Sequence, residues 1–166
     1  SAIQIARGNG ALVSFDVNYR AALWQDRDVG STLRSFVESA DIVFAGLEEA
    51  ALVVGEGEPA DVANRLAGIG PGEVVIKLGS AGAIALTGGV LLRRAAISVP
   101  VVDTVGAGDA FVAGYLAELL AGAQPDRRLA MAVKTGAFAC MVPGDWEGLP
   151  RRADLPLLDA GETVSR

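Results

Sequence analysis

Asp103-Thr104-Val105-Gly106-Ala107-Gly108-Asp109-Ala110-Phe111 is the one stretch of this sequence in which small residues, two acids and the start of a helix coincide. A β-type run over residues 97–102 leads into it, and an apolar helical run follows as far as Gly122, a natural C-cap. Strand, glycine turn and helix in this order place residues 106–108 at a helix N-terminus. Unpaired N–H groups and the helix dipole favour negative charge there, so the stretch predicts an anion-binding turn.

The helix that follows this turn is expected to bury one apolar side. Glu118 is the only charge within that apolar run. The residues expected on the buried side are Phe111, Val112, Tyr115, Leu116, Leu119 and Leu120.

Asp109 falls in the first turn of this helix, beside any anion held there. A carboxylate next to bound phosphate suits proton abstraction from an attacking hydroxyl. A plainer alternative is a capped helix in which Asp109 is only a dipole-favoured acid. A dinucleotide-binding fold is a third alternative, but its G-x-G-x-x-G pattern needs a small residue where Phe111 stands, and Pro100 interrupts the preceding strand. A Walker A loop is excluded because Gly-Lys-Ser/Thr occurs nowhere.

The pattern Asp103-Thr104-x-Gly106-Ala107-Gly108-Asp109 resembles the C-terminal signature of the PfkB/ribokinase-like carbohydrate kinases. The resemblance implies ATP and Mg²⁺ as cofactors and a sugar hydroxyl as acceptor. Asp109 would orient that hydroxyl and accept its proton, while Gly106, Ala107 and Gly108 would supply backbone donors to the transferring phosphate. Asp103 and Thr104 resemble the loop that holds a monovalent cation, such as K⁺, in some relatives.

The amino-acid composition indicates a fold class and excludes several kinds of function. The 166 residues suffice for one domain with a real core, and the 21 glycines suit an α/β protein with many tight turns. A net charge of −6 with scattered Lys and Arg argues against a nucleic-acid partner. The absence of histidine excludes His-based triads and most zinc sites, and the single Cys140 suggests a reducing, cytoplasmic compartment. The longest charge-free run, residues 78–92, is too short and too glycine-rich to span a bilayer.

The resembled family is nearly twice as long as this chain, which begins at Ser1 without Met. We therefore expect the C-terminal, nucleotide-binding part of a sugar kinase over residues 1–150 and a tail over 151–166. The implied fold is a ribokinase-like three-layer α/β/α sandwich with a mostly parallel central sheet, its N-terminal part and lid missing. The 166 residues alone are expected to be inactive, and the full-length protein is a possible homo-oligomer.

Residues 11–16 read as a buried strand that ends in an acid. Beyond it Asp16, Asn18 and Arg20 alternate, so in an extended segment they would share a face and hold a polyol and an anion. The alternative is a solvated turn with local Asx bonding. The segment Asp-x-Asn-x-Arg-x-x-Leu-Trp resembles that of 2-keto-3-deoxygluconate kinases, which implies that Arg20 binds the sugar acid's carboxylate or the transferred phosphate.

A short strand over residues 41–44 precedes the helix start Gly46-Leu47-Glu48-Glu49-Ala50. Acids in a first helical turn are usually just favoured by the dipole. The family places an Asn-x-x-Glu motif here that organises Mg²⁺ and phosphate. Glu49 matches its Glu, with Glu48 as the fallback, whereas Gly46 stands where the family has Asn.

Residues 73–78 predict a buried strand, and residues 83–86 the returning one, with a glycine turn between them. Lys77-x-Gly79-Ser80-x-Gly82 resembles the family's ATP-binding turn, in which the backbone of Gly79, Ser80 and Gly82 would approach the nucleotide and Lys77 would neutralise charge. An ordinary glycine hairpin is the alternative. A helix is expected over residues 29–40, with Leu33, Phe36 and Val37 inward. Further helices are expected over residues 59–69 and 126–141, and a strand over residues 90–93.

The four segments described above, which begin at Asp16, Gly46, Lys77 and Asp103, thus occur in the family's order over residues 11–150. They predict ATP-dependent phosphorylation of a primary hydroxyl of a sugar or sugar acid, with 2-keto-3-deoxygluconate as the expected substrate. Another PfkB-type sugar or nucleoside kinase, such as a fructokinase or ribokinase, stays open. So does a non-catalytic nucleotide-binding module.

Overall fold

The computed structural model describes residues 2–24 and 28–160. These divide into two compact units. We call Ser1–Gly79 with Ala83–Arg93 the sheet unit, and Ser80–Gly82 with Arg94–Arg166 the helical unit. Residues 161–166 of the expected tail lie outside the described residues.

The sheet unit is built on a sheet of five strands in the order β1-β2-β3-β4-β5 among the described residues. They are β1 (Ser14–Asp16), β2 (Ile42–Gly46), β3 (Glu73–Lys77), β4 (Ala83–Thr87) and β5 (Val90–Arg94). The pairs β1–β2 and β2–β3 are parallel, and β3–β4 is antiparallel. The β-branched runs of β2 and β3 are almost wholly buried, as expected for central strands of an α/β sheet.

The first strand is shorter than expected. Of the run 11–16 only the last three residues pair with β2, and Leu12 is exposed. β1 stands at the edge of the sheet, where a strand has one partner instead of two, so its burial is incomplete.

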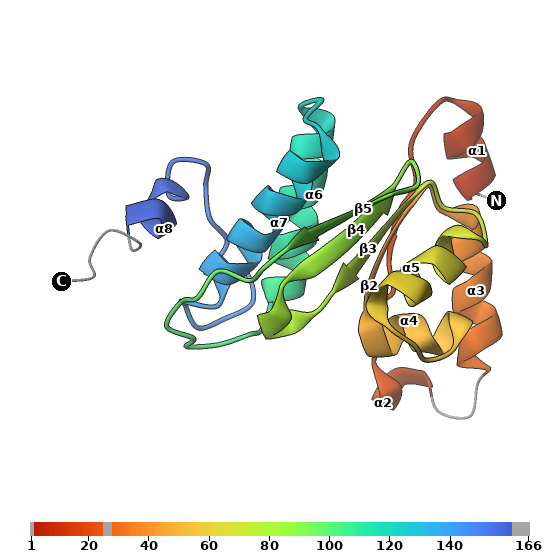
Figure 1. Ribbon diagram of the computed structural model, residues 1–166, viewed down its shortest axis with the longest axis horizontal. Coiled ribbons are helices and arrows are strands. Elements are labelled where there is room, and N and C mark those ends of the chain that lie inside the picture. The colour runs from red at the N-terminus through yellow and green to blue at the C-terminus, as the bar shows by residue number, and fades with distance from the viewer. Residues whose placement is uncertain (1, 25–27, 161–166) are drawn as a thin grey trace. The chain divides into compact units, whose positions relative to one another are not determined.

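The helices of the sheet unit are α1 (Ala2–Gly8), α2 (Ala21–Trp24), α3 (Val29–Ser39), α4 (Leu47–Val54) and α5 (Pro59–Ala67). Figure 1 shows α3, α4 and α5 side by side along the sheet. Asp28 caps α3 by accepting a hydrogen bond from the Ser31 N–H at 3.2 Å. Pro59 begins α5, where its missing N–H costs no helical bond.

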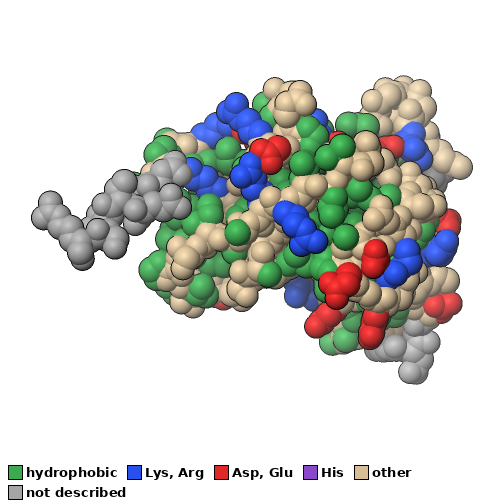
Figure 2. All heavy atoms as spheres, viewed as in Figure 1, with side chains coloured by type: hydrophobic (Ala, Val, Ile, Leu, Met, Phe, Trp, Pro, Cys, Tyr) green, Lys and Arg blue, Asp and Glu red, His purple; other side chains and the backbone are tan. Residues whose placement is uncertain are grey.

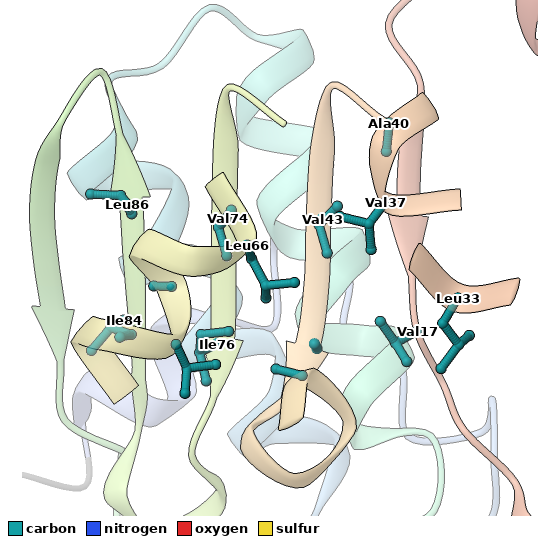
Figure 3. Close-up of a cluster of buried hydrophobic side chains, with 14 residues drawn as sticks. Val17, Leu33, Val37, Ala40, Val43, Leu66, Val74, Ile76, Ile84 and Leu86 are labelled. Carbon is teal, nitrogen blue, oxygen red and sulfur yellow. The ribbon is translucent and has the colours of Figure 1, made fainter. Parts of the chain in front are cut away.

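The core of the sheet unit is formed by every second residue of the strands and by one face of each helix. Alternate strand residues such as Val43, Val74 and Ile76 meet Val37 and Leu66 from the helices (Figure 3). The expectation that Phe36 also points inward is wrong, since it is 43% exposed. It lies at the border of the buried stripe of α3, with its ring 5.3 Å from that of Phe15.

A 3₁₀ turn, η1 (Gly79–Ala81), begins at the last residue of the first segment of the sheet unit and continues into the helical unit. The helical unit contains α6 (Ala107–Leu120), α7 (Pro125–Ala139) and α8 (Pro156–Ala160). α6 ends as predicted, with Gly122 at a positive φ of 73°. α6 packs closely on α7. The approach is so close that a Cβ at Gly114 of α6 would overlap Thr135 Oγ1 of α7. The glycine therefore sets how near the two helices approach.

Two expectations for this unit are wrong. Residues 97–102 form no strand: Pro100 lacks a donor, and the Val102 N–H instead donates to the Cys140 carbonyl at 2.8 Å. Glu118 is buried while Leu120 is 88% exposed. Glu118 continues the stripe of Phe111 and Tyr115 at helical spacing, and two arginines compensate its charge: Arg127 Nε lies 3.2 Å from its Oε2 and Arg152 Nη1 lies 2.6 Å from its Oε1.

The surface of the molecule is predominantly acidic over one part of the sheet unit. Figure 2 shows acidic side chains gathered over the region of α4 and α5, where the exposed acids are Glu48, Glu56, Glu58 and Asp61. Across the described residues, none of the helices is long and apolar enough to cross a membrane.

Candidate functional site

The glycine turn before α6 has the predicted form. Gly106 has a φ of 73°, a left-handed conformation, and caps a helix that begins at Ala107. A Cβ at Gly106 would overlap the carbonyl oxygen of Asp145, so only glycine fits. Gly108 and Asp109 are exposed in the first turn. The expected placement of residues 106–108 at a helix N-terminus is thus confirmed, with the Asp109 carboxylate open to solvent beside it.

Asp103 ties this turn together. Its Oδ1 accepts the Val105 N–H at 3.1 Å, and its Oδ2 accepts the Gly144 N–H at 3.2 Å. These backbone hydrogen bonds lower the pKa of Asp103, because they favour the charged carboxylate. Thr104 is exposed. Both carboxylate oxygens of Asp103 therefore already hold backbone, which is a structural role in addition to the expected one at a cation.

The segment after α7 supplies partners that the sequence analysis missed. The Cys140 carbonyl accepts the N–H groups of Val102 and Asp103, at 2.8 and 3.3 Å. Burial, and then the charge of Asp103, raise the pKa of the Cys140 thiol. The sequence carries no local signal for the hydrogen bond between the Gly144 N–H and Asp103, since the two residues are 41 positions apart.

In the sheet unit, Lys77 and Asp16 form an ion pair. Lys77 Nζ lies 2.8 Å from Asp16 Oδ1 and 2.9 Å from Oδ2, with the side chains 20% and 18% exposed. Asp16 ends β1 and Lys77 ends β3, so the pair crosses the end of β2 between them. The residues expected for the sugar and for the nucleotide are thus in direct contact.

The expectation that Asp16, Asn18 and Arg20 share the face of an extended segment is wrong. Asn18 has a positive φ of 39°, which turns the chain. Asn18 and Arg20 are exposed within the turn 17–20, whereas Asp16 pairs with Lys77. The Tyr19 ring lies 6.4 Å from that of Trp24 in α2.

Glu49 also accepts two backbone donors. Its Oε2 accepts the Gly46 N–H at 2.6 Å at the start of α4, which is the half of a capping box that a glycine N-cap without a side chain allows, and its Oε1 accepts the Tyr19 N–H at 2.9 Å. Glu48 is exposed. The described residues contain no group of three or more acidic, His or Cys side chains that could hold a metal ion. Glu49 could give a Mg²⁺ ion a single carboxylate, so such an ion would have to take most of its ligands from phosphates and water.

The turn expected to bind ATP contains glycines of two kinds. Gly79 has a φ of 56°, and among the described residues nothing lies within 4 Å of where its Cβ would be. Gly82 has a φ of 95°, and its Cβ would overlap the Arg94 carbonyl. Gly82 is therefore required for packing, while Gly79 and the exposed Ser80 leave the turn open to a ligand.

Within the sheet unit, the carboxyl ends of the parallel strands bring together Asp16, the turn 17–20, Glu49 and Lys77. Ligands of open α/β sheets bind at this edge. Within the helical unit, Asp103 to Asp109 form a compact turn at the start of α6. Each unit thus gathers its own part of the predicted site.

Comparisons with known proteins show the family to which the chain is similar. The family model described as pfkB family carbohydrate kinase matches residues 1–152. The 2-dehydro-3-deoxygluconokinase of Bacillus subtilis is 36% identical, over 95% of this chain and 50% of its own length. The fructokinase of Klebsiella pneumoniae is 37% identical, over 93% of this chain and 53% of its own length. The chain thus spans about half the length of the curated relatives it matches.

A solved structure extends the likeness to the fold. The fructokinase of Vibrio cholerae, crystallised with fructose, ADP and calcium ion, superposes with a TM-score of 0.86 at 30% identity, covering 95% of this chain and 53% of that one. The expected ribokinase-like α/β fold is therefore confirmed.

Proposed function

The chain belongs to the pfkB family of carbohydrate kinases, and on this basis we propose that the full-length protein transfers the γ-phosphoryl group of ATP to a primary hydroxyl of a sugar acid. The observation that carries the proposal is the exposed Asp109 in the first turn of α6, directly after the left-handed Gly106. A helix N-terminus attracts phosphate, and an acid beside it is placed to meet the attacking hydroxyl.

Asp109 orients the sugar hydroxyl and accepts its proton. The transition state of phosphoryl transfer is loose, so the attacking oxygen keeps its proton until late, and positioning is the main service of the carboxylate. The N–H groups of Gly106 and Gly108 would donate to the charge on the transferring group, whereas the Ala107 N–H, also expected there, already donates to the Thr104 carbonyl at 3.3 Å. Each such donor contributes of order 3 kcal/mol if it resembles other oxyanion donors.

MgATP supplies the phosphoryl group when bound. Lys77, with Gly79, Ser80 and Gly82 of the following turn, is proposed to hold the nucleotide. Lys77 lies at this edge of the sheet in an ion pair with Asp16, so it would have to share its charge between that carboxylate and the nucleotide.

For the metal ions, Glu49 is proposed to organise Mg²⁺ through water or phosphate, and Asp103 with Thr104 to lie at a monovalent cation such as K⁺. The ADP and calcium ion in the Vibrio cholerae fructokinase structure support a nucleotide and cation site in this fold.

The substrate proposed is 2-keto-3-deoxygluconate. Arg20 is exposed beyond β1, where a guanidinium can form two hydrogen bonds with a substrate carboxylate. The Bacillus subtilis relative carries this activity in its name. A fructokinase is the second candidate, since the Klebsiella pneumoniae enzyme is just as similar. If the substrate is a neutral hexose, it has no carboxylate for Arg20 to bind. The Arg20 guanidinium would then bind the transferring phosphate.

Substrate profiling of the full-length protein tests the proposal. ADP release is measured with 2-keto-3-deoxygluconate, fructose, ribose and no sugar, and kcat/KM is expected to be highest for the sugar acid. A higher kcat/KM for fructose would make fructose the substrate. No ADP release above background with any sugar would favour a non-catalytic nucleotide-binding module. The 166-residue chain measured in parallel is expected to be inactive, since it spans half of its relatives' length.

A further inference from the structure

Glu49 connects two parts of the sheet unit that are distant in sequence. One carboxylate oxygen accepts the N–H of Gly46, at the start of its own helix, and the other accepts the N–H of Tyr19, 30 residues away. Hydrogen bonds to a charged acceptor are about twice as strong as neutral ones. The side chain therefore fixes the turn after β1 to the N-terminus of α4.

The turn held in this way is a strained one. Asn18 has a positive φ of 39°, and a conformation of this kind persists only where the surroundings enforce it. On one side of Asn18, the Val17 N–H donates to the Phe44 carbonyl at 2.9 Å and continues the pairing of β1 with β2. On the other side, the Tyr19 N–H donates to Glu49. Hydrogen bonds from the backbone on both sides thus fix the conformation of Asn18. They therefore also fix where the backbone of Arg20 begins.

Gly46 makes room for this arrangement. A Cβ at Gly46 would lie 3.3 Å from Glu49 Oε2, which is tighter than ordinary contact, so the carboxylate would have to shift by a few tenths of an ångström. The glycine at this position, where the resembled family has Asn, therefore leaves the Glu49 side chain unhindered as it folds back against its own backbone. Gly46 and Glu49 act as one unit.

We propose that Glu49 is a positioning residue for the sugar: through the Tyr19 N–H it sets the turn 17–20 that presents Asn18 and Arg20. This inference rests on the proposed function, in which that turn binds the sugar. It is separate from the proposed role of Glu49 near Mg²⁺, and the two roles predict different kinetics.

The kinetic test compares Glu49→Gln with Asp61→Asn in the full-length protein. Glutamine keeps the shape but loses the charge and one acceptor, so the positioning role predicts that KM for the sugar rises by roughly 10-fold, whether or not the Mg²⁺ dependence also shifts through the role proposed for Glu49 near Mg²⁺. Asp61→Asn, an exposed acid in the first turn of α5, should leave KM for the sugar unchanged. A shift in Mg²⁺ dependence with an unchanged KM for the sugar would overturn the positioning role.

Hydrogen exchange provides a readout that needs no activity. Glu49→Gln is expected to speed exchange of the amides of Gly46 and Tyr19 relative to the parent protein and to Asp61→Asn, because only these amides lose their charged acceptor. Gly46→Ala, which presses on the carboxylate without removing it, should act in the same direction. Unchanged exchange in both variants would overturn the inference. If the protein phosphorylates no sugar, the proposed function fails while the exchange result still tells whether Glu49 holds the turn.

Discussion

Lys77 Nζ lies 2.8 Å from Asp16 Oδ1 and 2.9 Å from Oδ2, an ion pair that joins the ends of β1 and β3 across β2. Only about a fifth of either side chain is exposed, so solvent screens the pair incompletely. Removing one partner leaves the other charge poorly solvated. This relationship makes both residues structural as well as candidates for ligand binding.

Lys77→Met should therefore destabilise the protein by about 1–3 kcal/mol in urea unfolding, between the values for exposed and buried pairs. A double-mutant cycle with Asp16→Asn should recover part of the loss, because the uncompensated carboxylate is gone. The exposed pair of Arg34 and Glu38 on α3 is the matched control, with an expected coupling below about 0.5 kcal/mol. Equal coupling in the two pairs would contradict a special role for the buried one.

Asp109→Asn should lower kcat by about 10²–10⁴ with little change in ATP affinity, the range expected for loss of a general base. The control is Asp126→Asn, since Asp126 is an exposed acid in the first turn of α7. That variant loses the same favourable dipole interaction and should keep its kcat. An unchanged kcat in Asp109→Asn would show that Asp109 is not the general base. Asp109 would then be only an acid favoured by the helix dipole.

Arg20→Ala should raise KM for a sugar acid by roughly 10- to 150-fold, as expected for losing a charge-assisted hydrogen bond, and should leave KM for a neutral sugar nearly unchanged. Arg20→Lys should recover little, because a point charge cannot reproduce a two-pronged contact. Arg34→Ala, another exposed arginine of the sheet unit, is the control. A fall in kcat for acidic and neutral sugars alike would instead assign Arg20 to the transferring phosphate.

Gly106→Ala should be severely destabilising, because the new Cβ would overlap the Asp145 carbonyl in addition to the strain of a positive φ. Gly88→Ala separates the two effects. Gly88 has a φ of 54°, and no described atom lies within 4 Å of its Cβ position, so that variant should cost only the conformational strain, about 1–2 kcal/mol. Thermal unfolding of both variants measures the difference, and similar losses would mean that the loop holding Asp145 simply moves aside.

Asp103→Asn should destabilise the protein most at neutral pH. The pKa of Asp103 is lowered below its ordinary value of 3.8 in the folded state, so its contribution to stability is full above pH 3.8 and is lost as the pH falls through the folded pKa. The difference in unfolding free energy between parent and variant should therefore shrink as the pH is lowered from 7 through this range. A difference that grows on acidification would show that the hydrogen bonds to Val105 and Gly144 do not favour the carboxylate.

Much of this protein could be predicted from the sequence because the signals were local. Apolar residues at helical spacing, with Pro59 near a helix start and Gly122 after a helix end, predicted α5 and α6 with small errors at their ends. The β-branched run of residues 73–78 predicted β3. Gly106 to Asp109 predicted the turn, since a left-handed glycine before a helix depends on neighbours in sequence. The same short motif was enough to suggest the family.

Only the tertiary structure decided which polar groups meet. Asp16 pairs with Lys77 because the sheet order places β1 two strands from β3, and the Tyr19 N–H meets Glu49 because α4 begins beside the end of β1. Whether Glu118 is buried depends on arginines from beyond α6 that accompany it. A periodic pattern states which face of an element is apolar, but the partner of a charged side chain is fixed by strand register and helix packing between segments 9 to 61 residues apart, which no local pattern encodes.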